Sequence, residues 1–512
     1  MTALEPLEPS VDPAVAALAD AILIPPFPGT TAPRWLLDAL GRGLAGVTFF
    51  GQNVTGDTQS LTASLRAAAP AEPVIAIDEE GGDVTRVAYA SGSPYPGNAA
   101  LGAVDDVALT RDVYAAIGTD LLRLGINTNL APDADVLYLE GSAVVGTRSF
   151  GPDTALVARH VAAAVTGLQS AGIAACAKHF PGHGSTGDDS HLSLATVQGT
   201  MAEIRVRDLP PFTAAIAAGS IAVMPGHLRV PELTGTLPAT LSPAAVTGLL
   251  RGELGFGGVV ICDALEMKAA SAVFGIPEAA VLAVIAGVDL LCLGRDTDEA
   301  MYHAVRAAIA DAVASGRLAA GQLEEAASRV AALRARLASW RSGALGADGP
   351  VGGVVAGAED ADSGDGIGLV AARRALRRSG PVPAALADPL IVEVEPEESI
   401  AAGRFTWGFE PWAAVKRVDP AAGARAYLDG AAAGSILAAC AGRSLVLAVR
   451  DARTVIGLVE EVLAARPDAV IVEMGVPAWT PPPGTAYLAT YGASRVCAQA
   501  AAEALGLTGL QR

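Results

Sequence analysis

Residues 154–180 have the sequence TALVARHVAAAVTGLQSAGIAACAKHF, in which an Ala- and Leu-rich stretch leads into the short apolar run ACAKHF (175–180). The stretch has the length and composition of a helix, and the run those of a buried strand. The same alternation extends through the first 300 residues. Seven further apolar runs occur, at 21–26, 46–50, 73–78, 126–132, 221–227, 258–263 and 288–294. Eight strands that alternate with helices predict an α/β fold of the (β/α)8 TIM-barrel type.

The composition changes after the amphipathic stretch LEEAASRVAALRARLASW (323–340). Residues 342–365 are rich in Gly, Ala and Asp, which is typical of a linker. Beyond them, the apolar runs PLIVEVEP, RSLVLAVRD, DAVIVEMG and AYLATYG alternate with helical segments. We therefore predict a catalytic barrel at 1–341, a linker at 342–365 and a smaller α/β (αβα) sandwich domain at 366–512.

Charge and cysteine content bear on partners and on the compartment. The formal net charge of −19 argues against nucleic acid or an anionic membrane as a partner. No apolar run reaches the roughly 18 residues that a membrane span requires, and the acidic N-terminus lacks the basic region of a secretory signal. The five cysteines are odd in number, widely spaced and set among apolar residues, as buried thiols are. We expect a cytoplasmic protein that binds neither nucleic acid nor membrane.

Polar side chains end several of the predicted barrel strands. In such barrels the C-terminal strand ends converge on the active-site face. A single aspartate after a strand often caps the next helix, but five strands in succession that end in polar groups indicate a shared cleft. The residues at these ends are Asp78, Asp135, Lys178, His179, His227 and Asp263.

Asp263 closes the run VVIC and precedes ALEMKAA, so a helix N-cap is one interpretation. The interpretation that we favour is a carboxylate nucleophile at the strand end. Retaining cleavage of a glycoside requires such a carboxylate, which forms a covalent glycosyl intermediate. It also requires a second group that protonates the leaving oxygen.

The densest motif is KHFPGHGSTGDDSH (178–191), which holds three of the six histidines. Its glycines predict a turn-rich loop after the fifth strand. An aspartate two residues before a histidine, as in Asp189-Ser190-His191, can fix the imidazole tautomer and raise its pKa. We predict that His191 is a general acid/base held by Asp189, the alternative being a solvated loop histidine without a role.

This motif resembles the signature of the β-N-acetylglucosaminidase-like branch of glycoside hydrolase family 3, a branch that includes β-glycoside phosphorylases. AIDEEGGDVTRV (76–87), NTNLAPDADV (127–136), GTRSFGPD (146–153), VMPGHLRVPEL and ICDALEMKAA are similar to further segments of that family. The resemblance implies a β-linked sugar substrate, with Asp263 as the nucleophile and Asp189–His191 as the acid/base pair. It implies that the sugar contacts Asp78, Arg86, Asp135, Arg148, Lys178, His179, Met224 and His227.

The chain departs from the family pattern at three places. Glu79 stands where Gln is usual, Cys262 where Ser or Thr is common, and Pro225-Gly226 where Thr-Ala is more frequent. The last two lie beside the expected sugar site. The choice between a β-glucoside and an N-acetyl-β-glucosaminide therefore stays open.

The acceptor of the sugar is open as well. A carboxylate acid/base would become anionic after the first step and repel phosphate, whereas a histidine becomes neutral and does not. Lys178, Arg86 and Arg148 could attract an anion, while Asp188 and Asp189 bring negative charge. Water and inorganic phosphate are thus both candidate co-substrates, and we expect no other cofactor and no metal.

Three rival functions remain. A metal-dependent barrel hydrolase would use His179, His183, His191 and His227 with an aspartate, although Pro181 and two glycines disfavour a helix that presents the first two. A Schiff-base aldolase would use Lys178 with a pKa lowered by burial. A non-catalytic sugar-binding relative would have lost Asp263 or His191, and this chain retains both.

Overall fold

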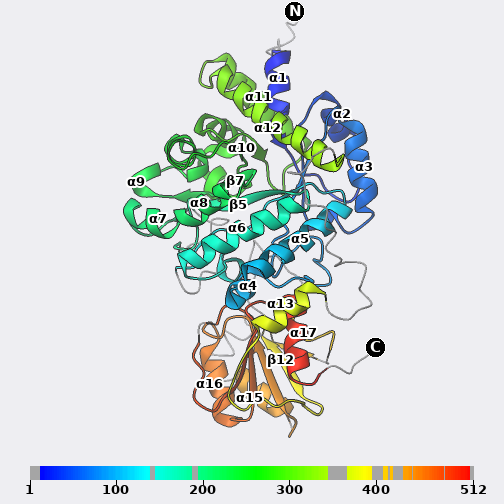
Figure 1. The fold of residues 1–512 in the computed structure, drawn as a ribbon, viewed down its shortest axis with the longest axis vertical. Helices are drawn as coiled ribbons and strands as arrows, with labels where there is room; N and C mark the ends of the chain where they lie inside the picture. Colours follow the sequence, from blue (N-terminus) through cyan, green and yellow to red (C-terminus); the bar gives the residue numbers. More distant parts are fainter. Residues whose placement is uncertain are drawn as a thin grey trace, which may run out of the picture.

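The computed structural model describes residues 12–138, 144–186, 194–343, 366–394, 407–412, 415–418, 431–440, 442–477 and 479–507. In this part of the chain the larger parallel sheet lies between residues 46 and 260, and a second large sheet lies between residues 377 and 489. Figure 1 shows the two bodies one above the other, with helices α4, α13 and α17 where they meet.

All eight predicted barrel strands are present, each buried along its whole length. They are β1 (Leu23–Ile24), β2 (Gly46–Phe49), β3 (Val74–Ile77), β4 (Thr128–Asn129), β5 (Ala174–Phe180), β7 (Ala222–Pro225), β9 (Val259–Val260) and β10 (Leu291–Cys292). Burial on both faces explains why most of these strands are apolar along their length and do not alternate. The buried β4 is polar, and the side chain of its Asn129 bonds the backbone N and O of Glu79.

The strands close into a ring. Strands β2-β3-β4-β5-β7-β9 form one parallel sheet in that order, and β1 pairs in parallel with β10. The bridge between Ile261 and Leu290 joins the end of β9 to β10, and Thr48 N donates to Pro25 O to join β2 to the end of β1. The predicted (β/α)8 barrel is confirmed. A small added pair, β6 (Ala195–Thr196) with β8 (Leu228–Arg229), lies outside the ring.

Helices surround the barrel, and the stretches predicted as helical at 112–125, 154–172 and 323–340 fall on α5, α6 and α12. The α-helices are α1 (Pro13–Asp20), α2 (Arg34–Arg42), α3 (Thr58–Ala68), α4 (Asn98–Val104), α5 (Val107–Arg123), α6 (Thr154–Ser170), α7 (Met201–Arg207), α8 (Leu209–Ala217), α9 (Pro231–Thr234), α10 (Lys268–Ala286), α11 (Glu299–Ala314) and α12 (Ala320–Arg341). Short 3-10 helices are η1 (Gly51–Asn53), η2 (Gly146–Arg148) and η3 (Ala239–Leu241), and η4 (Ala244–Glu253) is a π-helix.

Helix α10 bears on the expectation that no segment spans a membrane. It is the one helix in the described part of the chain that is long and apolar enough, by length and composition, to cross a membrane. Its second half packs into the barrel core through Ala280, Val281 and Val284, and its backbone breaks at Gly275. Because core helices pass the same test, this finding is weak evidence for a membrane span.

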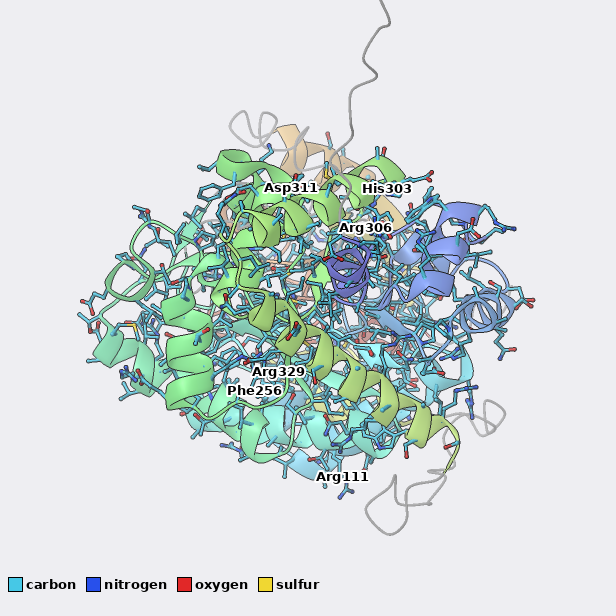
Figure 2. The ribbon with its side chains drawn as sticks, turned by 90° about the horizontal axis from the view of Figure 1, so that it is seen from above. Arg111, Phe256, His303, Arg306, Asp311 and Arg329 are labelled. Carbon is cyan, nitrogen blue, oxygen red and sulfur yellow. The ribbon has the colours of Figure 1, made fainter. Side chains whose placement is uncertain are left out.

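Ion pairs close the N-terminal end of the barrel. Asp289, which precedes β10, pairs with Arg251 at 2.5 Å and with Arg329 at 3.1 Å, and Asp20, which precedes β1, pairs with Arg306 at 2.9 Å. Figure 2 shows Arg306 and Arg329 on the side covered by α11 and α12, away from the second body. This end therefore stabilises the fold, and the opposite end is left for chemistry.

The second large sheet has the order β11-β16-β15-β14-β12-β13, parallel except for β11. Its strands are β11 (Arg377–Ser379), β12 (Leu390–Val394), β13 (Val415–Val418), β14 (Leu445–Val449), β15 (Val470–Glu473) and β16 (Ala486–Ala489). Its helices are α13 (Ile367–Ala375), α15 (Ala431–Cys440), α16 (Ile456–Ala465) and α17 (Arg495–Ala504).

Successive residues of β12 and of β14 point to opposite faces of the sheet, each of which packs against its own hydrophobic core. Ile391 and Val446 point into the core that includes Ala498 of α17, whereas Val392 and Leu447 point into the core that includes Ile436 of α15. Helices cover both faces, so the predicted αβα sandwich is confirmed. Residues 344–365 of the predicted linker lie outside the described residues.

Candidate active site

A buried network of opposite charges lies at the C-terminal ends of β3 and β5. Lys178, within β5, donates from Nζ to Asp78 Oδ1 at 2.6 Å and lies 2.8 Å from Glu80 Oε1. The side chains of Lys178 and Glu80 are almost wholly buried, but Asp78 keeps 21% of its side chain exposed. Asp78 thus has a carboxylate edge that can accept a ligand hydroxyl. It caps no helix, because the next one is α4 at residue 98.

Arg148 of η2 joins this network from the fourth connection of the barrel. Its Nη2 and Nε donate to the two oxygens of Glu80 at 2.7 and 2.9 Å, and its Nη1 donates to Val144 O. Arg148 therefore pairs with a buried acid and not with a surface one. Glu80 bridges both cations, and although burial opposes its ionisation, Arg148 and Lys178 hold the pKa of Glu80 well below its usual value.

The same contacts decide the state of Lys178. Burial alone would lower its pKa, but the adjacent Asp78 and Glu80 carboxylates outweigh burial and raise the pKa of Lys178. A lysine nucleophile must lose its proton at working pH. The structure therefore disfavours the Schiff-base aldolase.

Asp135 organises the start of the motif at 178–191. Its Oδ2 lies 2.8 Å from His179 Nδ1, and its Oδ1 accepts from His183 N at 2.6 Å and from His179 N at 3.2 Å. Burial raises the pKa of Asp135, but the nearby His179 imidazole outweighs burial and lowers it to about 2. His179 Nε2 lies 3.4 Å from Arg148 Nη2, so this pair adjoins the charge network.

Asp133, Asp135 and His179 form a cluster that could hold a metal ion, since their ligand atoms lie within 4.8 Å of one another. Arg148 Nη2, however, lies 3.7 Å from Asp133 Oδ2, and a fixed positive charge beside the cluster opposes a cation. Burial and the neighbouring Asp135 raise the pKa of Asp133 well above its usual value, which weakens it further as a ligand. Of the four histidines in the metal hypothesis, His183 and His227 lie outside this cluster.

Asp263 follows β9 and the bridge at Ile261, at the C-terminal end of its strand. It is half-buried, and its Oδ1 accepts from Ala264 N at 2.8 Å. Helix α10 begins at Lys268 with Met267 as its N-cap residue, so Asp263 does not cap it. His227, at the end of β7, donates from Nε2 to Ala264 O at 2.9 Å and so adjoins Asp263.

Asp78 and Asp263 follow β3 and β9, two strands of the same parallel sheet, so both lie at the C-terminal end of the barrel. Burial raises the pKa of Cys292 to about 12, and the negative charges of Asp78 and Asp263 both contribute. The pKa of Cys176 is raised mainly by burial and again partly by both aspartates.

The remaining predicted site residues are placed as follows. Met224 of β7 is buried beside Lys178, its partner in the strand register. Arg86 is half-buried in the connection after β3, and its backbone N donates to Glu79 Oε2 at 2.8 Å. Asp189 and His191 lie outside the described residues.

Two acidic residues of the site, Glu80 and Asp133, were not among the predicted ones. Each stands two residues from a predicted one, Asp78 or Asp135, within a quoted motif. The signal that could have found Glu80 is charge balance. Two buried cations, Lys178 and Arg148, need more buried negative charge than Asp78 supplies.

Glu79 predicts a pH-dependent stability. Burial raises its pKa to about 7, although Arg86 N and Val87 N both donate to its Oε2. The folded state holds this proton more tightly than the unfolded chain, whose pKa is 4.5, so stability falls as pH rises from 4.5 to 7. At pH 8, the free energy of unfolding of Glu79→Gln, measured by urea denaturation, should exceed that of wild type by on the order of 3 kcal/mol. The two proteins should converge towards pH 4.5, and an equal difference at both pH values would contradict this assignment.

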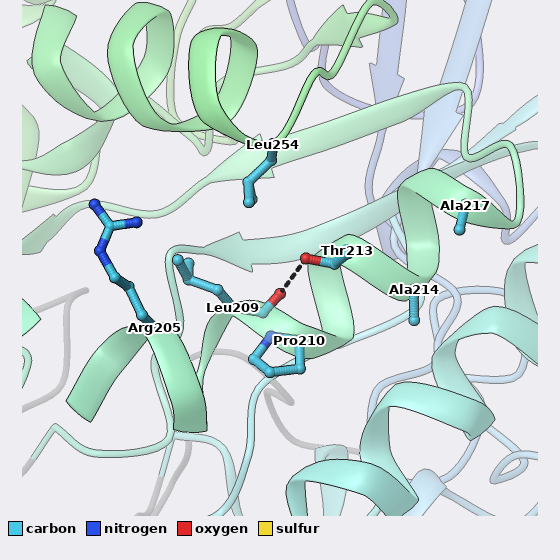
Figure 3. A pocket seen from close by; sticks show the side chains of 7 residues that line it. All are labelled: Arg205, Leu209, Pro210, Thr213, Ala214, Ala217 and Leu254. Atoms are coloured by element: carbon cyan, nitrogen blue, oxygen red, sulfur yellow. Dashed lines mark hydrogen bonds between the residues drawn. The ribbon is translucent and has the colours of Figure 1, made fainter. Parts of the chain in front are cut away.

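A surface cavity of about 480 Å³ lies away from these residues. It is lined by α8 together with Arg205 and Leu254. Figure 3 shows these side chains around an open hollow between the outer helices, with Thr213 donating to Leu209 O. Its lining is mostly apolar and contains no carboxylate. Because glycoside cleavage requires carboxylates, this cavity is not a candidate active site.

Comparison with known proteins shows the family of the chain. The glycosyl hydrolase family 3 N-terminal domain matches residues 32–333. Beta-hexosaminidase A of Pseudoalteromonas piscicida is 34% identical over 336 residues, which are 60% of this chain and 56% of that protein. The chain thus spans little more than half the length of that relative. A beta-hexosaminidase of Stenotrophomonas maltophilia is 38% identical over 272 residues, which cover 51% of this chain and 80% of the relative.

A solved structure extends the likeness to both domains. The family 3 beta-N-acetylglucosaminidase from Paenibacillus sp. superposes with a TM-score of 0.81 and 29% sequence identity. The superposition covers 96% of each chain. The domain match covers more than half of the chain, and the solved structure is a member of the same family. The chain therefore belongs to glycosyl hydrolase family 3.

Proposed function

We propose that this protein is a retaining β-N-acetylhexosaminidase that hydrolyses β-linked N-acetylglucosaminides. The observation that carries the proposal is the place of Asp263, a half-buried residue at the C-terminal end of a barrel strand, which is the end where the Asp78–Lys178–Glu80–Arg148 network lies. The names of the relatives, beta-hexosaminidase and beta-N-acetylglucosaminidase, support the choice of sugar.

The mechanism has two steps. Asp263 attacks the anomeric carbon while His191, held by Asp189, protonates the leaving oxygen. Water, activated by the same histidine, then cleaves the glycosyl-Asp263 intermediate, and the β configuration is retained. Asp78, Lys178 and Arg148 hold the sugar hydroxyls, with Arg86, His179, Met224 and His227 lining the site and Asp135 orienting His179.

Water is the acceptor that the charges favour. Two of the three cations that could hold phosphate, Lys178 and Arg148, are already paired with the carboxylates of Asp78 or Glu80. A phosphate dianion would meet these carboxylates as well as the cations. Transfer to phosphate is thus the less favoured outcome, and the experiment below distinguishes the two.

The test is a product assay on aryl N-acetyl-β-glucosaminide and aryl β-glucoside, each with and without inorganic phosphate. We expect faster cleavage of the acetamido sugar, free sugar as the product, and no acceleration by phosphate. An α-sugar 1-phosphate would identify a phosphorylase, and faster cleavage of the glucoside would overturn the sugar assignment. Loss of activity after chelation would favour the metal-dependent rival.

We also propose a cytoplasmic location, with neither nucleic acid nor membrane as a partner. All five cysteines are free and buried, as expected in a reducing compartment. Fractionation of the producing cells with an antibody to the full chain tests this, and recovery from the medium or the membrane fraction would contradict it.

A further inference from the structure

The connection after β3, which we call the β3 loop (residues 78–97), carries Asp78, Glu79, Glu80 and Arg86 but is not built by the barrel alone. Val84, which lies between Glu80 and Arg86, is 2% exposed and packs in the hydrophobic core of the second domain with Phe409 and Leu488. The second domain thus holds the part of the loop that lies between Glu80 and Arg86.

Asp83 makes a polar anchor beside this apolar one. Its Oδ1 accepts from Ala493 N at 3.0 Å, and its Oδ2 accepts from Thr147 Oγ1 at 2.8 Å and from the Arg450 guanidinium. The side chain of Asp83 is 3% exposed. One buried carboxylate therefore joins three segments: the β3 loop, η2 of the barrel, and the second domain.

The two second-domain donors lie at the carboxyl edge of its sheet. Arg450 directly follows β14, and Ala493 follows β16 by a few residues. In a doubly wound sheet this edge is where ligands are usually bound. Here part of the edge contacts the C-terminal face of the barrel, which Figure 1 shows with the second body beside α4.

The loop has little freedom to absorb a change at Asp83. Gly82 has a φ of +61°, and a Cβ on it would lie 2.4 Å from Gly97 Cα, so two backbone segments cross in contact. Thr147 is covalently next to Arg148, and Glu80 lies three residues before Asp83. Because close-packed segments transmit displacement, a shift of Asp83 would reach both partners of the Arg148–Glu80 pair.

We propose that Asp83 and Arg450 form an interdomain positioning pair through which the second domain fixes Asp78, Glu80 and Arg148 for sugar binding. The proposal rests on the proposed function for the role of those three residues. Neither Asp83 nor Arg450 touches the sugar. Their effect is on where the sugar ligands stand.

The kinetic consequence differs from that of a chemical residue. Ligands of the sugar ring act in both the ground state and the transition state, so their displacement raises KM and leaves kcat largely unchanged. Loss of a charge-assisted hydrogen bond of this kind corresponds to about a tenfold change or more in an equilibrium constant, here the one for sugar binding. We expect Arg450→Met and Asp83→Asn each to raise KM about tenfold, with a much smaller change in kcat.

The experiment compares these variants, in the full chain, with a matched control. Arg374 also reaches from the second domain to the barrel, pairing with Asp106 at 2.9 Å, but at the start of α5 and on the surface. Arg374→Met should keep wild-type KM and kcat on aryl N-acetyl-β-glucosaminide. The double variant Asp83→Asn/Arg450→Met should be no worse than the worse single variant, because the two residues act as one unit.

A second measurement is independent of activity. Amide hydrogen exchange in Arg450→Met should increase at residues 80–86 and 144–149, and should stay at the wild-type rate in α11 and α12. Wild-type exchange at those residues, or an unchanged KM in an active Arg450→Met enzyme, overturns the positioning pair. Increased exchange in a protein whose wild type cleaves neither aryl glycoside would support the pair and overturn the proposed function.

Discussion

Asp263→Ala is expected to lower kcat/KM on an aryl N-acetyl-β-glucosaminide by about 10⁴-fold or more, because it removes the carboxylate that forms the glycosyl intermediate in the proposed mechanism. Asp263 is half-buried and does not cap α10, whose N-cap residue is Met267. Its removal should leave the fold intact, since half-buried polar residues outside the core contribute little to stability.

Azide makes this prediction specific for a retaining mechanism. The cavity left by Asp263→Ala admits a small anion, which can attack the anomeric carbon once in place of the carboxylate. We expect sodium azide to restore cleavage of an activated aryl β-glycoside and to yield the α-glycosyl azide, as single inversion requires. Asp38→Ala, which removes an exposed carboxylate on α2, should behave as wild type without azide. A β-azide, or normal turnover by Asp263→Ala, would contradict the assignment.

Much of the fold could be predicted from local sequence. Buried parallel strands are mostly apolar on both faces, and the eight barrel runs could therefore be recognised against their flanks. Two edge strands of the second sheet, which escaped prediction, lack this property. β11 (Arg377–Ser379) is exposed along its length, and β13 (Val415–Val418) carries Lys416 and Arg417. Edge strands are held mainly by backbone hydrogen bonds, and their side chains are less buried, so their sequences need not be apolar.

The site was predictable where a residue ends a strand, and less so where its role depends on a distant partner. Asp78, Asp135 and Lys178 were found because barrel topology brings strand ends together. Glu80 gains its importance from Arg148, which is 68 residues away. Asp83 gains its importance from Arg450, more than 360 residues away. Contacts of that separation belong to tertiary structure, and no local pattern encodes them.

Glu80→Gln is expected to lower the free energy of unfolding by about 3–5 kcal/mol at pH 7, because it leaves two buried cations without their shared anion. Gln keeps the size of the side chain and one acceptor oxygen, so the loss reports charge rather than volume. Glu253 offers a matched control. It is paired with Arg205 through two hydrogen bonds, as Glu80 is with Arg148, but its side chain is 49% exposed. Surface pairs of this kind are screened by water, so Glu253→Gln should unfold close to wild type.

The difference in free energy of unfolding between wild type and Glu80→Gln should depend on pH. Arg148 and Lys178 lower the pKa of Glu80 in the folded state, so its charge stabilises the fold above the unfolded value of 4.5. That stabilisation is lost as pH falls below 4.5. Urea unfolding of wild type and Glu80→Gln should therefore differ most near neutral pH and converge in acid. A difference that stays constant from pH 7 to pH 3, or one no larger than that of Glu253→Gln, would mean that Glu80 acts through packing and not as the shared counterion of Arg148 and Lys178.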